Sequence, residues 1–152
     1  MLTFDPSPAG YCQYGNESNW CMSSWYCCPA NVTTHSTYLQ NIQPGDQYVG
    51  SFNLTSPTEF QVLSQSVATG ASSTLVAPRQ NRDFNWADVT LECYYVKECS
   101  GMAQGLMSFN DLLLWDTKYQ DIEPDWSFTP SKPCNGTIQE FWDTTITIQH
   151  GQ

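Results

Sequence analysis

The amino-acid sequence predicts an all-β protein whose antiparallel strands pack as a β-sandwich or jelly roll. Apolar and polar residues alternate with period two in several short runs, whereas the spacing of an amphipathic helix does not recur. Pro, Gly, Asn and Asp interrupt these runs at short intervals and mark turns. A length of 152 residues is typical of one domain. We therefore expect a single domain over residues 1–152, with an irregular segment over residues 1–19.

Predicted strands follow one another along the chain, most of them closed by a residue that favours a turn. Pro29 ends the first strand, and Pro44 with Gly45 stands where a tight turn needs both residues. Residues 68–71 are a flexible turn that predicts a hairpin. The predicted strands cover residues 20–27, 36–42, 47–54, 60–65, 73–77, 84–96, 106–115, 125–129 and 144–149.

Two of these strands indicate which face is buried. In 47–54, Phe52 points to the apolar face and Asn53 to the wet face. We expect Trp25, Phe52 and Trp126 in the core. In 84–96, one face is apolar and the other carries the residues Trp86, Asp88, Thr90, Glu92 and Tyr94. This second face is the candidate functional surface, although a solvated strand face would show the same pattern.

The charge of the chain excludes two classes of partner. Its formal net charge is −10, with only five Lys and Arg, so nucleic acid and an anionic membrane surface would be repelled. No run approaches the roughly 20 apolar residues of a membrane span. Residues 1–6 lack the basic start and apolar stretch of a leader peptide, so secretion would require a leader that has been removed.

Glycosylation sequons and cysteines together predict a secreted glycoprotein. The Asn-X-Ser/Thr sequons, none blocked by proline, begin at Asn16, Asn31, Asn53 and Asn135. Seven cysteines are many for a cytosolic domain and favour disulfides, with Cys99 and Cys134 as the expected pair because both lie in connecting segments. The odd count leaves one thiol over.

No metal or cofactor is expected. The sequence has no Cys-X-X-Cys pair, and its two histidines, His35 and His150, do not complete a zinc ligand set. We expect His35 to be a hydrogen-bonded surface histidine. Neither a Ser-His-Asp signature nor a phosphate-binding glycine loop is present.

Several short blocks resemble the fungal glutamic peptidases, also called eqolisins. Ser24-Trp25-Tyr26 with Pro29 is similar to that family's Trp/Tyr-rich strand, and 42–47 is similar to its Ile-X-X-Gly-Asp-X turn. Residues 87–92 resemble its Ala-Glu-Trp-Ile-Val-Glu strand, and 106–111 and 144–148 resemble later blocks. The likeness spans roughly residues 24–149. It implies a concanavalin-like sandwich of two curved antiparallel sheets.

The resemblance also implies which residues would be catalytic. Eqolisins hydrolyse peptides in acid with a paired glutamate and glutamine. The glutamate position falls on Asp88, Glu92 matches a second acidic position, and Gln13 is the candidate glutamine. Aspartate in place of glutamate withdraws the carboxyl group by one methylene, which is large against the tolerance for positioning a catalytic group.

Three functions remain open on the sequence. The first is a non-catalytic domain that binds a glycan or a peptide through Trp86, Asp88, Glu92 and Tyr94, since aromatic rings beside carboxylates suit both ligands. The second is an acid-active glutamic endopeptidase, and the third is a polysaccharide-cleaving enzyme. The oligomeric state is not predicted.

Overall fold

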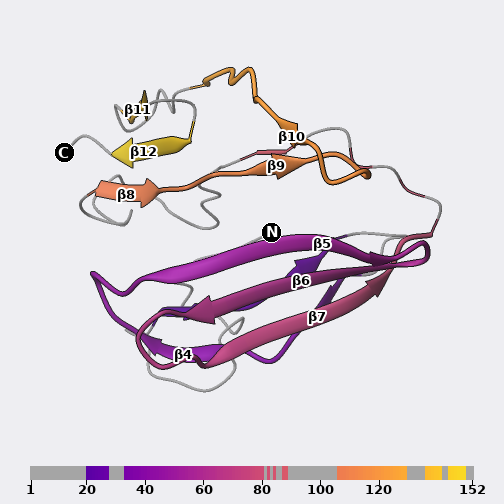
Figure 1. Cartoon of the computed structure of the whole chain (residues 1–152). Helices are drawn as coiled ribbons and strands as arrows, with labels where there is room; N and C mark the ends of the chain where they lie inside the picture. The colour runs from indigo at the N-terminus through magenta and orange to yellow at the C-terminus, as the bar shows by residue number, and fades with distance from the viewer. Residues whose placement is uncertain are drawn as a thin grey trace. The chain divides into compact units, whose positions relative to one another are not determined.

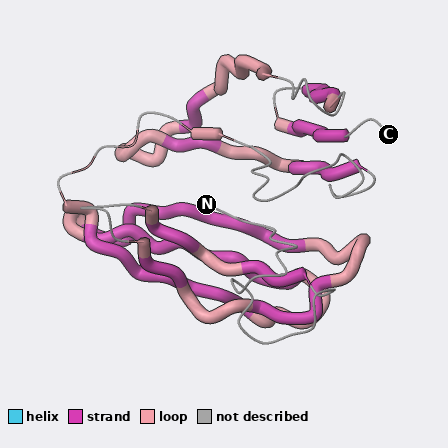
Figure 2. Tube along the Cα trace, turned by 180° about the vertical axis from the view of Figure 1, so that it is seen from behind, coloured by secondary structure: helices cyan, strands magenta, loops and turns pink. Residues whose placement is uncertain are grey.

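The structure, a computed structural model, describes residues 20–27, 33–80, 82, 84, 87–88, 106–129, 136–141 and 144–149. These residues form antiparallel strands and loops without a helix (Figures 1 and 2), which confirms the all-β prediction. The strands are β1 (Trp20–Met22), β2 (Trp25–Tyr26), β3 (Thr34–His35), β4 (Leu39–Ile42), β5 (Tyr48–Ser56), β6 (Glu59–Ser66), β7 (Ser72–Pro78), β8 (Leu106–Phe109), β9 (Leu114–Trp115), β10 (Asp121–Ile122), β11 (Thr137–Phe141) and β12 (Thr145–Gln149).

Contacts divide the chain into two compact units, Met1–Glu92 and Cys93–Gln152. The first unit contains the sheet β5-β6-β7 and the strand pairs β1-β4 and β2-β3. The second contains the sheet β11-β12-β8 and the hairpin β9-β10. Among the described residues, no helix is long and apolar enough to cross a membrane.

The sheet β5-β6-β7 is a meander whose register decides which side chains face the interior. Phe60, Val62 and Ser64 of β6 are buried, and they pair with Ala77, Leu75 and Ser73 of β7. Because side chains alternate across a strand, Gln61, Leu63 and Gln65 point to the opposite, outer face. The expected hairpin around residues 68–71 is confirmed, with Gly70 at φ +71°.

A second layer covers the inner face of this sheet; Figure 1 shows its strand β4 on one side of β5-β6-β7. β2 pairs with β3 so that Trp25 lies opposite His35 and Tyr26 opposite Thr34. Ser24 continues this ladder, since the Ser36 amide donates to its carbonyl at 3.0 Å. The pleat therefore turns Ser24, Ser36 and Tyr26 inward, all of them buried, and Trp25 and His35 outward.

Serine hydroxyls join the two layers. Ser24 and Ser36 come from the second layer, and Ser64 and Ser73 come from β6 and β7; all are buried. Ser24 Oγ lies 3.1 Å from Ser64 Oγ and 2.9 Å from the carbonyl oxygen of Ser73. Ser36 Oγ contacts Ser73 Oγ, which lies 2.6 Å from the carbonyl oxygen of Thr37. We call these four residues the serine cluster.

Carbonyl acceptors determine the direction in which Ser24 and Ser73 donate within the serine cluster. A hydroxyl has one proton, so Ser24 donates to the Ser73 carbonyl and must accept from Ser64. By the same reasoning Ser73 donates to the Thr37 carbonyl and accepts from Ser36, whose hydroxyl oxygen also lies 3.3 Å from the Ser24 carbonyl oxygen. Ser36 Oγ also accepts from the Ser24 amide at 3.0 Å. The four hydroxyls of the serine cluster are therefore satisfied by one another and by the backbone.

Alanine substitutions in the serine cluster should not be additive. Ser64→Ala removes a donor and should lower the free energy of unfolding by about 1 kcal/mol. Ser24→Ala leaves the Ser64 hydroxyl, which is 0% exposed, without its acceptor. It should lower the free energy of unfolding by about 2–3 kcal/mol. The double variant should lower the free energy of unfolding by less than the sum of the two single losses, because it also removes the unsatisfied Ser64 hydroxyl. Urea unfolding measures all three; exposed Ser72→Ala is the control, and additive losses would contradict the hydrogen bond between Ser24 and Ser64.

The turn between β4 and β5 forms where Pro44 and Gly45 predicted it. Gly45 has φ +92°, the left-handed region that glycine adopts freely, and the Asp46 amide donates to the Gln43 carbonyl at 3.1 Å. The Asp46 carboxylate in return accepts from the Gln43 amide at 2.9 Å and lies 3.4 Å from the Tyr48 hydroxyl. Partial burial, followed by the charge of Asp46 and this hydrogen bond, raises the pKa of Tyr48.

The ionisation of Tyr48 should therefore make the free energy of unfolding depend on pH only in alkali. Its folded-state pKa is raised above the unfolded value of about 10, so its contribution is complete below that pH and lost as pH rises through the folded pKa. Asp46→Asn should lower the Tyr48 pKa, because it removes the negative charge that opposes the phenolate. NMR titration of ring-labelled tyrosine measures the Tyr48 pKa in the wild type and in Asp46→Asn. The Tyr48 signal is assigned by its loss in Tyr48→Phe. An unchanged pKa in the Asn variant would exclude a role for the Asp46 charge.

Among the described residues of the second unit, the buried ones lie on β12. Ile146 and Ile148 are buried, and β12 pairs with β11 on one edge and β8 on the other. The hairpin β9-β10 closes on Asp116, whose Oδ1 accepts from the Lys118 amide at 2.7 Å and the Gln120 amide at 3.0 Å. This carboxylate replaces hydrogen-bonding partners that the short loop lacks.

Several predicted elements are shorter or divided. The strand expected over 20–27 is two strands with different partners, β1 and β2. The strand expected over 106–115 breaks into β8 and β9, because Asp111 adopts φ +54°, which Asp tolerates better than most residues. The strand expected over 125–129 is wrong: the chain there is irregular after Pro124, which has no amide proton for a ladder.

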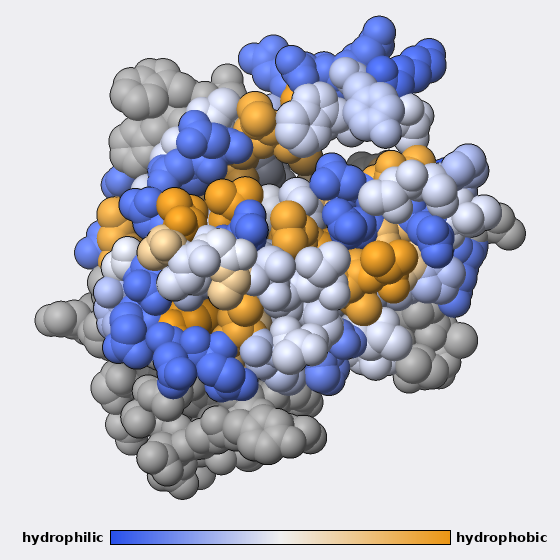
Figure 3. All heavy atoms as spheres, turned by 60° about the horizontal axis from the view of Figure 1, so that its bottom comes forward, coloured by the Kyte–Doolittle hydropathy of each residue, from blue (hydrophilic) through white to orange (hydrophobic). Residues whose placement is uncertain are grey.

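The expected core residues are also corrected. Phe52 is 45% exposed, and Trp25 and Trp126 are half-buried. The buried residues of the first unit are smaller or belong to other strands; they include Met22, Tyr26, Ile42, Phe60, Val62 and Ala77. On the face in Figure 3, hydrophobic side chains of the described residues lie in several small groups rather than one large patch.

Candidate functional site

Asp88 is the one predicted catalytic or ligand-binding residue that the structure describes. It is exposed and, like Phe84 and Ala87, does not lie in a strand. The other predicted site residues, Gln13, Trp86, Glu92 and Tyr94, lie outside the described residues. The same is true of the expected Cys99–Cys134 pair and of the sequons at Asn16, Asn31 and Asn135.

The chain that leads to Asp88 is attached to the inner face of the β5-β6-β7 sheet by a ring cluster. Phe84 meets Phe52 and Phe60 edge-on, with ring centroids 5.1 and 4.9 Å away, and Phe52 stacks on Phe60 at 4.8 Å. These are favourable geometries for aromatic pairs. The three residues, which we call the phenylalanine cluster, therefore place the start of the predicted functional segment.

The phenylalanine cluster is only partly covered. Phe60 is buried, but Phe52 is 45% and Phe84 51% exposed. Two large rings thus offer apolar surface next to a segment that, four residues after Phe84, carries an exposed carboxylate at Asp88. Sequence alternation put Phe52 on the correct face, but nothing in the sequence indicated that Phe84 would cross to it from a different segment.

Two arginines hold the loop between β7 and Phe84. Arg79 donates from Nε to the Arg82 carbonyl at 3.0 Å, and its amide donates to the Thr58 carbonyl at 2.8 Å. The guanidinium of Arg82 lies 5.8 Å from the centre of the Tyr26 ring, a cation–π contact. Both cations therefore help to position the chain that precedes the phenylalanine cluster.

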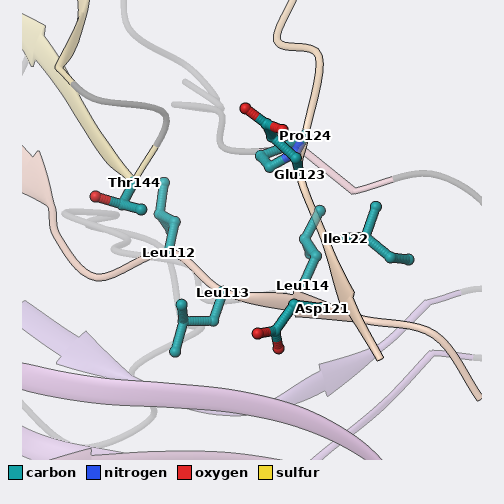
Figure 4. Close-up of a pocket in the computed structure, with 8 residues that line it drawn as sticks. All are labelled: Leu112, Leu113, Leu114, Asp121, Ile122, Glu123, Pro124 and Thr144. Carbon is teal, nitrogen blue, oxygen red and sulfur yellow. The ribbon is translucent and has the colours of Figure 1, made fainter. Parts of the chain in front are cut away.

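A cleft of about 310 Å³ lies in the second unit, beside the hairpin β9-β10. In Figure 4, Leu113 and Asp121 point to one side of the hairpin and Leu114 to the other. The lining residues are Leu112, Leu113, Leu114, Asp121, Ile122, Glu123, Pro124 and Thr144. Most of this surface is apolar, its two carboxylates are exposed, and the lining contains neither a histidine nor a cysteine.

A second aromatic cluster lies on the outward face of the β2-β3 hairpin. The His35 ring is 4.8 Å from Trp25 and 5.0 Å from Tyr38, and Trp25 is 6.2 Å from Tyr38. His35 is exposed, and its Nδ1 lies 2.9 Å from the Ser36 carbonyl oxygen. The expectation of a hydrogen-bonded surface histidine is confirmed. We call these three residues the hairpin ring cluster.

Within the described ranges, no three His, Cys, Asp or Glu side chains are grouped so that they could hold a metal ion.

Comparisons with known proteins return one solved structure. No family model matches the chain, and no curated protein matches it. The chain is similar to the crystal structure of aspergilloglutamic peptidase from Aspergillus niger, with 12% sequence identity, 87% of each chain covered and a TM-score of 0.48. The resemblance to glutamic peptidases is therefore a remote structural similarity.

Proposed function

We propose that the chain is a secreted, N-glycosylated β-domain, related in fold to glutamic peptidases, that binds an extended glycan or peptide without cleaving it. The observation that carries this proposal is the phenylalanine cluster. It attaches the segment containing Asp88 to the inner sheet face and leaves Phe52 and Phe84 about half exposed. Rings beside a carboxylate bind the apolar face of a ligand and accept hydrogen bonds from its polar groups.

The environment of Asp88 supports binding over catalysis. An exposed carboxylate is solvated, whereas a catalytic carboxyl that must hold or release a proton on demand is usually desolvated or placed beside a charged partner. The aspartate side chain is also one methylene shorter than the glutamate of the resembling family. Both features favour a surface that holds a ligand.

Asn53 and Cys21 support the proposal of a secreted glycoprotein. Asn53 is exposed on the outer face of β5, where its Nδ2 donates to Ser51 Oγ at 3.1 Å. Phe52, the preceding residue, points to the inner face, so a glycan on Asn53 would leave the phenylalanine cluster clear. Cys21 is disulfide-bonded, and disulfides persist in oxidising compartments.

Substitutions in the phenylalanine cluster should weaken binding without unfolding the chain. A glycan array and a library of extended peptides identify the ligand of the wild type. Phe84→Ala and Phe52→Ala should then raise its Kd at least tenfold, since each removes an exposed contact ring. Asp88→Asn should raise it several-fold. Phe128→Ala, an exposed phenylalanine of the second unit, is the matched control. No ligand for the wild type, or no loss in Phe84→Ala, would refute the proposal.

Cleavage assays separate binding from catalysis. We expect no hydrolysis of an unfolded protein near pH 3 with pepstatin present, and no reducing ends released from plant or fungal polysaccharides. Hydrolysis of the protein that is abolished by Asp88→Asn or Glu92→Gln would instead show an acid endopeptidase. Reducing ends abolished by the same variants would show a polysaccharide-cleaving enzyme.

A further inference from the structure

The hairpin ring cluster lies on the face of the β2-β3 hairpin that points away from the inner face of the β5-β6-β7 sheet. Tyr26 points into the layer interface and is buried, so its neighbour Trp25 points outward. Trp25 and His35 are directly paired across β2 and β3, which puts both rings on the same face, and Tyr38 joins them from the chain after β3. The serine cluster fixes this hairpin from behind through Ser24 and Ser36. The rings are thus held on a rigid support.

The hydrogen bond of His35 leaves one ring nitrogen for a ligand. A carbonyl oxygen only accepts, so Nδ1 carries the proton that it donates to Ser36. In the neutral imidazole, Nε2 is then an acceptor. His35 is exposed, and this nitrogen can accept a hydrogen bond from a hydroxyl group of a ligand lying against the rings.

The segment that supplies His35 and Tyr38 to the hairpin ring cluster is polar and uncharged. Residues 33–38 read Thr-Thr-His-Ser-Thr-Tyr and contain no Asp, Glu, Lys or Arg. The threonines at positions 33, 34 and 37 are exposed. In a chain with a net charge of −10, a stretch without formal charge and with exposed hydroxyls does not select an ionic ligand. It suits a neutral ligand that is itself rich in hydroxyls.

We propose that Trp25, His35 and Tyr38 form a second binding site, which takes a neutral carbohydrate chain. The flat rings stack on the C–H faces of the sugar units, and Nε2 of His35 accepts from a sugar hydroxyl. Neither contact requires charge. This site uses other residues than the Asp88 surface and points away from the inner sheet face, so either one can fail without the other.

The test uses neutral hexaoses as probes and removes the sequon that is nearest to His35 in the sequence. The sequon at Asn31 lies four residues before His35, so all variants are made in an Asn31→Gln background. Cello-, laminari-, xylo-, manno- and chitohexaose are titrated by calorimetry and by tryptophan emission. At least one should bind. Its Kd should change little between low and high salt. Salt screens interactions between charges, and neither the ring stacking nor the hydrogen bond to Nε2 involves a charge.

Variants separate the rings from the acceptor. Trp25→Ala and Tyr38→Ala should each weaken binding at least tenfold, and His35→Phe, which keeps a ring but loses Nε2, should weaken it about fivefold. Trp115→Ala, an exposed tryptophan of β9, and Phe84→Ala should leave it unchanged. Circular dichroism and urea unfolding confirm folding; if Trp25→Ala unfolds, Tyr38→Ala and His35→Phe decide.

Four results would overturn the proposal. One is no binding of any hexaose to the Asn31→Gln chain. Another is binding that Tyr38→Ala and His35→Phe leave unchanged. The third is binding that Phe84→Ala removes, which would assign the sugar to the phenylalanine cluster and leave the proposed function standing. Extended peptides that compete with the bound hexaose for Trp25 and Tyr38 would show a peptide site instead.

Discussion

The hydroxyl network of the serine cluster is the constraint on which the first unit depends. The hydrophobic effect has no direction, but each hydroxyl of Ser24, Ser36, Ser64 and Ser73 has a directed partner. In a low-dielectric interior a network of this kind is stable only when every member is satisfied. Few arrangements of the two layers achieve that. The network therefore specifies how β2 and β3 sit on β6 and β7, at the cost of a smaller apolar core.

The faces on which Trp25, His35, Phe52 and Asn53 lie follow from that arrangement and from the pleat of the strands. With Ser24 and Ser36 turned inward, Trp25 and His35 must turn outward. In the facing sheet, Phe52 and Phe60 turn inward, and Asn53 turns outward. Groups suited to ligand binding and to glycosylation are thus one residue apart in sequence and on opposite faces in space.

Charge has a limited part in these surfaces. The chain has five cationic residues, and two of them, Arg79 and Arg82, hold backbone and the Tyr26 ring in place. The phenylalanine cluster and the hairpin ring cluster consist of aromatic rings; an exposed carboxylate, Asp88, follows Phe84 by four residues in the chain, and the second cluster includes one imidazole. Recognition by such surfaces depends on stacking and hydrogen bonding, and a strongly acidic protein can use it for uncharged ligands despite its net charge.

The sequence by itself determined what depends on local physics. Alternation predicted antiparallel strands and the faces of Phe52 and Asn53, and Pro44-Gly45 predicted the turn before β5, because these features depend on neighbouring residues alone. Tertiary structure decided what depends on distant partners. Strand 20–27 divides because its halves pair with β4 and β3, and 125–129 forms no strand although it resembles one. Alternation likewise could not show that buried serines would join the layers, that Phe84 would reach Phe52, or that Trp25, His35 and Tyr38 would meet, since each contact joins segments that only the fold brings together.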